Sequence, residues 1–137
     1  MTDPGRQTVI PSDLGAARVV QEEIEASLAA FFAEHDLFAI KMAVEEALVN
    51  AIKHGNQMDP GKFVRVAYAL SPARFEVRIT DEGSGFNPDD VPDPTSPENL
   101  ERPCGRGLLL MRYYMSEVTF HDGGKTIAMA KLRNGTK

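Results

Sequence analysis

The chain has 137 residues, of which 42% are hydrophobic, and its formal net charge is −5 at pH 7. This length suits one domain around one core, so we expect a single domain over residues 1–137. No apolar run approaches the length that spans a bilayer, the N-terminal residues do not resemble a secretory signal, and basic residues do not cluster. We therefore expect a cytoplasmic protein that binds neither membranes nor nucleic acid. Cys104 is the single cysteine, which excludes an internal disulfide and a multi-cysteine zinc site.

The first half of the chain predicts a short strand followed by two helices. Residues 7–10 form the strand, and Ser12 is a suitable N-cap for a helix that runs to about residue 33. Asp36 is the expected cap of the second helix, whose apolar positions repeat at threes and fours from Leu37 to Ile52. Gly55 stands where a residue in the left-handed conformation commonly ends a helix.

The second half predicts two hairpins separated by an irregular segment and a short helix. Residues 63–70 and 75–80 alternate between apolar and polar, as do the shorter segments 118–120 and 126–132. Prolines between residues 86 and 105 exclude a long helix, so we expect a lid over about 86–105 and a helix from Leu108 to Met115. This order predicts a two-layer α/β sandwich, with helices on one face of a mixed, mostly antiparallel sheet.

Glu46 and Asn50 are one turn apart and project from the same face of the second helix. A carboxylate in this place can take a proton from an attacking hydroxyl, and a carboxamide oxygen suits Mg²⁺. By itself the pair is more typical of a solvated helix surface, where Glu and Asn are common. His54 lies one further turn along and fits either a contact with phosphate or metal, or a role in capping the end of the helix.

Two glycine-bearing segments complete the pattern. Asp81 ends an alternating strand and leads into Gly83 and Gly85, where an acid can accept a hydrogen bond from an exocyclic amine such as that of adenine. The segment Gly105-Arg106-Gly107 precedes an apolar helix, where free backbone amides and a guanidinium attract phosphate. Each segment alone is also typical of an ordinary turn, but together and in this order they indicate an ATP site.

In these three segments the chain resembles the GHKL ATPases and kinases. Glu46-x-x-x-Asn50 resembles their N box, Asp81-x-Gly83-x-Gly85 their G1 box, and Gly105-x-Gly107 their G2 box. The runs Glu-Ala-Leu-Val-Asn-Ala-Ile-Lys-His-Gly and Asp-Glu-Gly-Ser-Gly-Phe-Asn-Pro are similar to the anti-sigma-factor serine kinases of the RsbW and SpoIIAB type. The resemblance implies a Bergerat fold that binds ATP and Mg²⁺ and forms a homodimer. It also implies two partners, a sigma factor and a STAS-type anti-anti-sigma protein that is phosphorylated on serine.

The resemblance further implies a role for each matching position. Glu46 would be the general base, Asn50 the Mg²⁺ ligand, and Asp81 the acceptor for the adenine amine. The remaining residues would shape the pocket or border the triphosphate: Gly83, Gly85, Gly105, Arg106 and Gly107. The predicted function is an ATP-dependent protein-serine kinase in a partner-switching circuit. Two alternatives stay open: a module that binds ATP and sequesters a partner without transfer, and a catalytic domain that serves a histidine kinase in trans.

Overall fold

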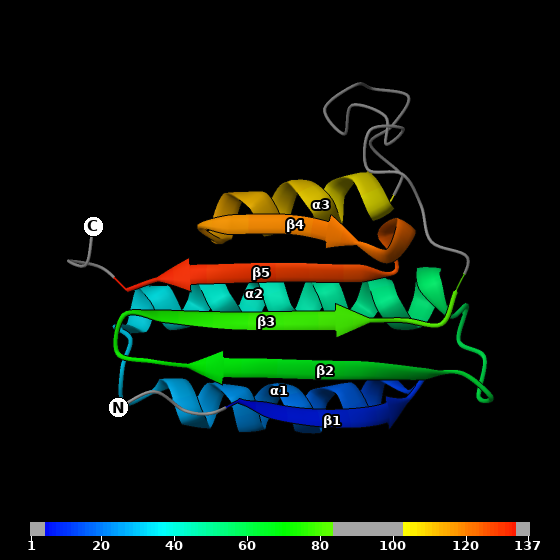
Figure 1. The fold of residues 1–137 in the computed structure, drawn as a ribbon, viewed down its shortest axis with the longest axis horizontal. Helices are drawn as coiled ribbons and strands as arrows, with labels where there is room; N and C mark the ends of the chain where they lie inside the picture. Colours follow the sequence, from blue (N-terminus) through cyan, green and yellow to red (C-terminus); the bar gives the residue numbers. More distant parts are fainter. Residues whose placement is uncertain (1–4, 84–102, 134–137) are drawn as a thin grey trace.

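The computed structural model describes residues 5–83 and 103–133, with the backbone alone for residues 103–106 (Figure 1). The elements follow the predicted order, strand–helix–helix–strand–strand and then helix–strand–strand. Their bounds are β1 Arg6–Pro11, α1 Leu14–Leu28, α2 Glu34–Val49, β2 Phe63–Leu70, β3 Arg74–Thr80, α3 Pro103–Tyr114, β4 Glu117–His121 and β5 Thr126–Leu132. A π-helical turn, Asn50–Gly55, continues α2, and a 3₁₀ turn, Asp122–Gly124, joins β4 to β5.

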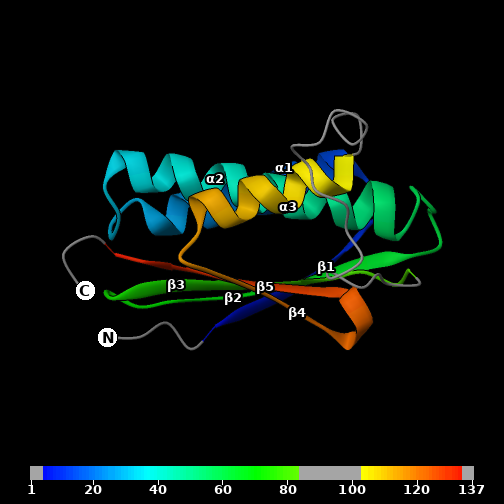
Figure 2. The same cartoon turned by 90° about the horizontal axis from the view of Figure 1, so that it is seen from above.

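The molecule is a two-layer α/β sandwich in which α1, α2 and α3 lie on one face of the sheet (Figure 2). The strand order is β1-β2-β3-β5-β4, and every pair of neighbours among the described strands is antiparallel. The predicted sandwich is therefore confirmed, but the prediction of a mixed sheet is wrong for these strands. No helix in the described part of the chain is long and apolar enough to cross a membrane.

Alternation along the central strands supplies much of the sheet side of the core. In β2 and β3 every second side chain points toward the helices and is buried, while the intervening side chains lie on the opposite face. Burying each large aliphatic or aromatic side chain contributes about 1.5–3 kcal/mol. The largest of these fully buried side chains, from sheet and helices together, include Phe75, Ile24, Leu28, Ile40, Leu48, Ile52, Ile79 and Met111.

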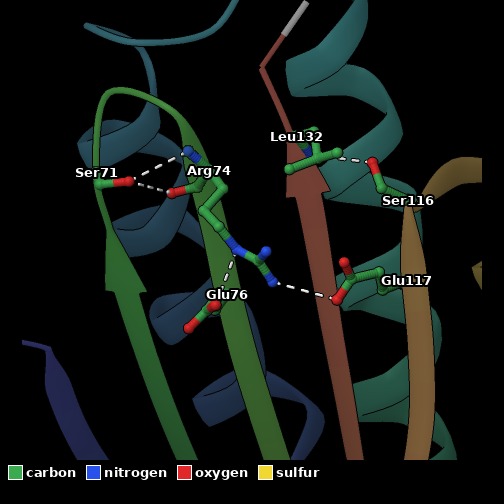
Figure 3. A network of polar contacts seen from close by, with 6 residues as sticks. All are labelled: Ser71, Arg74, Glu76, Ser116, Glu117 and Leu132. Carbon is green, nitrogen blue, oxygen red and sulfur yellow. Dashed lines mark hydrogen bonds and ion pairs between the residues drawn. The ribbon is translucent and has the colours of Figure 1, made fainter. Parts of the chain in front are cut away.

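The face of the sheet away from the helices carries several charged side chains on β3 and β4. Arg74 Nε lies 2.8 Å from Glu76 Oε2, and its Nη2 donates to Glu117 Oε1 at 3.2 Å, so one guanidinium connects β3 with β4 across β5 (Figure 3). The turn between β2 and β3 is closed by Ser71, whose Oγ accepts from the Arg74 N–H at 3.2 Å. These contacts are half-exposed and fix the strand ends more than they stabilise the fold.

Both predicted helix caps are wrong. Asp13 caps α1, because its Oδ2 accepts the Ala16 N–H at 2.9 Å, whereas Ser12 is buried and donates to the Lys62 carbonyl at 2.7 Å. α1 also ends at Leu28, earlier than predicted. In α2 the cap position is Ala33, and Asp36 lies inside the first turn, buried, with its Oδ1 4.0 Å from Lys131 Nζ. For Ser12 a contact distant in sequence takes the side chain away from the cap, whereas the Asp36 Oδ1 lies closer to Nε2 of the neighbouring His35, at 3.3 Å, than to Lys131.

Two further boundaries differ from the prediction. The backbone at Gly55 is not left-handed; the positive φ angles occur after it, at Gln57 (53°) and Met58 (59°). The helix predicted from Leu108 begins at Pro103, where a proline is favoured because the first turn needs no N–H donor from it. Residues 103–105 of the predicted lid are thus helical, and residues 86–102 lie outside the described residues.

Candidate functional site

Gly107 brings α3 into contact with the two polar side chains predicted on α2. A Cβ atom placed on Gly107 would lie 2.6 Å from Glu46 Oε2 and 2.7 Å from Asn50 Nδ2, closer than real Cβ atoms approach. Only glycine therefore lets α3 pack here while both side chains keep their positions. Glu46 lies in the last turns of α2 and Asn50 opens the π-helical turn, a kind of irregularity that is frequent at functional sites.

Asp81 lies between two glycines at the same end of the sandwich. A Cβ on Gly55 would overlap the Asp81 carboxylate, and a Cβ on Gly83 would overlap the backbone carbonyl of Gly55. The Asp81 Oδ1 accepts the Gly83 N–H at 2.8 Å, and the Asp81 N–H donates to the Lys125 carbonyl at 3.0 Å. Gly55 is thus glycine because a carboxylate occupies the space beside it.

The π-helical turn Asn50–Gly55 links these two groups of contacts. Its first residue lies against Gly107, and its last residue lies against Asp81. The structure therefore brings residues of all three predicted segments together around the carboxyl end of α2. Polar and charged side chains from a helix end and a strand end converge there, and the second helix, α3, contributes the glycine that lies against them.

Burial changes the acidity of both carboxylates. Burial raises the pKa of Glu46, and the nearby charge of Glu45 raises it further, while His54 acts in the opposite direction. Burial also raises the pKa of Asp81, opposed by the Gly83 N–H hydrogen bond and by the charges of Lys125 and Lys62. A carboxylate with a raised pKa is a stronger base, which is the property that proton abstraction from a hydroxyl requires.

The Asn50 side chain fits the requirement for a magnesium ligand. Its Oδ1 is buried and has no hydrogen-bond partner in the described part of the chain, which is costly unless another group satisfies it. Mg²⁺ prefers hard oxygen ligands and commonly takes one or two from the protein and the rest from water and phosphate. Among residues 5–83 and 103–133 no group of three or more His, Cys, Asp or Glu side chains could hold a metal by itself. A single carboxamide oxygen is thus the kind of donor expected for an ion shared with a phosphate ligand.

Of the remaining predicted site residues, the structure describes some only by their backbone and one not at all. Gly105 and Arg106 lie in the first turns of α3, and the Arg106 side chain is outside what the structure describes, as is Gly85. Their contacts with a triphosphate stay a prediction. His54 is exposed in the π-helical turn, close enough to Glu46 for its charge to act on that carboxylate.

Sequence reasoning missed Asn56, which is fully buried beside the Asp81 turn. Its Oδ1 accepts the Glu82 N–H at 2.7 Å, and its Nδ2 donates to Ser12 Oγ and to the Phe63 carbonyl, each at 3.0 Å. An Asn after a Gly is typical of an ordinary turn. Its partners lie 44 and 26 residues away for Ser12 and Glu82, so no local signal identifies it.

The model of the histidine kinase-like ATPase domain family matches residues 10–131. Anti-sigma F factor of Bacillus cytotoxicus is 38% identical over 117 residues, which cover 77% of this chain and 79% of that protein. Serine-protein kinase RsbW of Bacillus mycoides is 29% identical over 107 residues, or 73% of this chain. The match covers 66% of that kinase, so the chain spans about two thirds of its length.

A solved structure shares the fold. The crystal structure of the RsbU and RsbW domains of a Mycobacterium tuberculosis protein is similar with a TM-score of 0.61 at 19% sequence identity. The similarity covers 95% of this chain and 31% of the Mycobacterium tuberculosis chain. At this identity the likeness extends to the fold alone, and it includes nearly every element described above.

Proposed function

Because the chain belongs to the histidine kinase-like ATPase domain family, we propose that it is an ATP-dependent protein-serine kinase that also holds a sigma factor inactive. Its substrate in this proposal is a STAS-type anti-anti-sigma protein. The observation that carries the proposal is the contact of Gly107 with Glu46 and Asn50, which gathers a base and a hard oxygen ligand beside the Asp81 turn. Relatives named serine-protein kinase RsbW and anti-sigma F factor support both halves of the proposal.

In the proposed reaction each residue has one task. Asp81 accepts a hydrogen bond from the adenine amine and thereby orients the nucleotide. Asn50 would hold Mg²⁺ through its unpartnered Oδ1, and the ion would supply charge neutralisation on the phosphates. Glu46 accepts the hydroxyl proton of the substrate serine. At the same time the serine Oγ bonds to the γ-phosphorus of ATP, and the bond between the γ-phosphorus and the β-phosphate oxygen breaks. The products are phosphoserine and ADP.

Phosphate transfer from labelled ATP to a STAS protein tests the catalytic half. The wild type should transfer phosphate to serine, and Glu46→Gln, which keeps the shape but not the basicity, should lose transfer while still binding ATP. Glu45→Gln is the matched control. It removes a charge that raises the pKa of Glu46, but it leaves the carboxylate of Glu46 in place, so transfer should persist at a reduced rate. Transfer by Glu46→Gln at the rate of the wild type contradicts the assignment of the base.

The same assay distinguishes the alternatives. ATP binding without transfer, together with capture of a sigma factor, would identify a sequestering module, as the name of the 38% identical relative suggests for that protein. Phosphate that is lost from the acceptor in acid would identify phosphohistidine and a catalytic domain working in trans. Sedimentation of the chain with and without its partners tests the homodimer that forms part of the proposal.

A further inference from the structure

Three hydrogen bonds close a ring beneath the turn Asp81–Gly83. The Glu82 N–H donates to Asn56 Oδ1 at 2.7 Å, and Asn56 Nδ2 donates to the Phe63 carbonyl at 3.0 Å. The Phe63 N–H in turn donates to Glu82 Oε1 at 2.6 Å. The ring joins the residue after the π-helical turn and the start of β2, which are seven residues apart, to the turn after β3, which is 26 residues from Asn56.

Both Nδ2 hydrogens and the Oδ1 atom of Asn56 are engaged in hydrogen bonds. Its side chain is 0% exposed, and its second Nδ2 hydrogen goes to Ser12 Oγ at 3.0 Å, which itself donates to the Lys62 carbonyl at 2.7 Å. The carboxamide thus uses its oxygen once and both of its hydrogens. A buried amide group left unpaired is strongly unfavourable, so the Glu82 N–H and the Phe63 carbonyl are held in place together through Asn56.

The ring fixes the place of the Asp81 carboxylate. Asp81 precedes Glu82, whose backbone N–H is held by Asn56, and its own N–H is held by the Lys125 carbonyl at 3.0 Å. The carboxylate itself lies against Gly55, the residue before Asn56. A turn released from Asn56 can move away from the helix end and carry the carboxylate with it.

We infer that the ring of Asn56, Glu82 and Phe63 is a clamp that sets nucleotide affinity by holding Asp81 in register with the nucleotide base. Asn56 and Glu82 are then positioning residues that act through Asp81. The inference rests on the proposed ATP site. Loosening the clamp raises the KM for ATP and weakens the preference for ATP over GTP, whereas kcat from bound ATP changes little because Glu46 and Asn50 are not part of the ring.

Substitutions at Glu82 give the cleanest test, since this side chain is exposed and the fold tolerates its truncation. Glu82→Ala removes the acceptor for the Phe63 N–H and should raise the KM for ATP about tenfold. Glu82→Gln removes the same charge but keeps an acceptor oxygen, so its KM should stay close to that of the wild type. Hydrogen exchange at the Phe63 and Glu82 amides should accelerate in Glu82→Ala alone.

Ser12→Ala is the matched control at Asn56. It removes a partner of the same carboxamide without opening the ring, so it should lower the thermal midpoint and leave the KM for ATP unchanged. Asn56→Asp keeps the acceptor for the Glu82 N–H but places a second oxygen opposite the Phe63 carbonyl, so it should raise the KM for ATP. If this variant does not fold, the Glu82 variants test the clamp.

A Glu82→Ala protein with the KM and base preference of the wild type overturns the clamp, as does an equal rise in KM for Glu82→Gln. Absence of ATP binding by the wild type overturns the proposed function as well. The hydrogen-exchange comparison then still reports whether the ring itself exists.

Discussion

Replacing Gly107 by alanine should separate the stability of this protein from its activity. Alanine in the interior of α3 is favoured over glycine by about 1 kcal/mol. Against this gain, the new Cβ would lie 2.6 Å from Glu46 Oε2 and 2.7 Å from Asn50 Nδ2. Both atoms are the ends of flexible side chains, so they can retreat without moving the backbone.

The size of that movement decides the two effects. Glu46 Oε2 must retreat by about 0.8 Å to reach an ordinary contact distance of 3.4 Å. A side chain forced off its rotamer costs about 0.5–1.5 kcal/mol, which offsets the helix gain and leaves the free energy of unfolding nearly unchanged. Displacement of a catalytic group by close to 1 Å, in contrast, can lower a rate about 100-fold.

Two measurements on the same samples test this reasoning. The thermal midpoint of Gly107→Ala should stay within about 4 °C of the wild type, as expected for a change below 1 kcal/mol in a domain of this size. Phosphate transfer to the STAS protein should fall by about 10- to 100-fold.

Gly15→Ala is the matched control. It adds a methyl group to α1, where the nearest atom is Asp13 Oδ2 at 3.2 Å and neither Glu46 nor Asn50 lies within 4 Å. This variant should keep full transfer. Full transfer by Gly107→Ala would refute the packing of α3 against Glu46 and Asn50, and so would a large loss of stability.

Three other substitutions have defined outcomes. Glu46→Gln should be more stable than the wild type near neutral pH, because burial raises the pKa of this carboxyl and the folded state disfavours its ionised form; in urea titrations the advantage should vanish as the pH falls below the ordinary glutamate value of 4.5. Phe75→Ala, at a 0% exposed site, should lower the free energy of unfolding by about 3–5 kcal/mol, and a change below 1 kcal/mol in the same titration would contradict the described core. Asp13→Ala should cost about 1 kcal/mol through loss of the α1 cap, measured by thermal melting; an unchanged midpoint would return the cap to Ser12.

The order of the elements and the pairing of Glu46 with Asn50 could be predicted from the sequence, because both depend on local spacing. Apolar residues at threes and fours place α2, and alternation places β2 and β3, within a few residues of their observed bounds. One helical turn separates Glu46 from Asn50, and this spacing already puts them on one face.

Helix ends were predicted less well, since a side chain that can cap a helix can also bond to a distant strand. Ser12 has the chemistry of a cap, yet its hydroxyl is taken by the carbonyl of Lys62, 50 residues away. The prolines of residues 86–105 predict an irregular segment that includes Pro103, although proline also begins helices, as it does in α3.

The sequence by itself determined the periodicities, and with them the elements and the faces they bury; the tertiary structure alone decided why particular small and polar residues stand around the site. Gly55 is a residue type that commonly ends helices, but its lack of a side chain leaves space for the carboxylate of Asp81. Gly107 likewise leaves room for Glu46 and Asn50. Asn56 is a residue type that is common in turns, but its carboxamide forms hydrogen bonds with Ser12, Phe63 and Glu82. Periodicity acts between neighbours along the chain, whereas these contacts exist only after the sandwich has brought distant segments together.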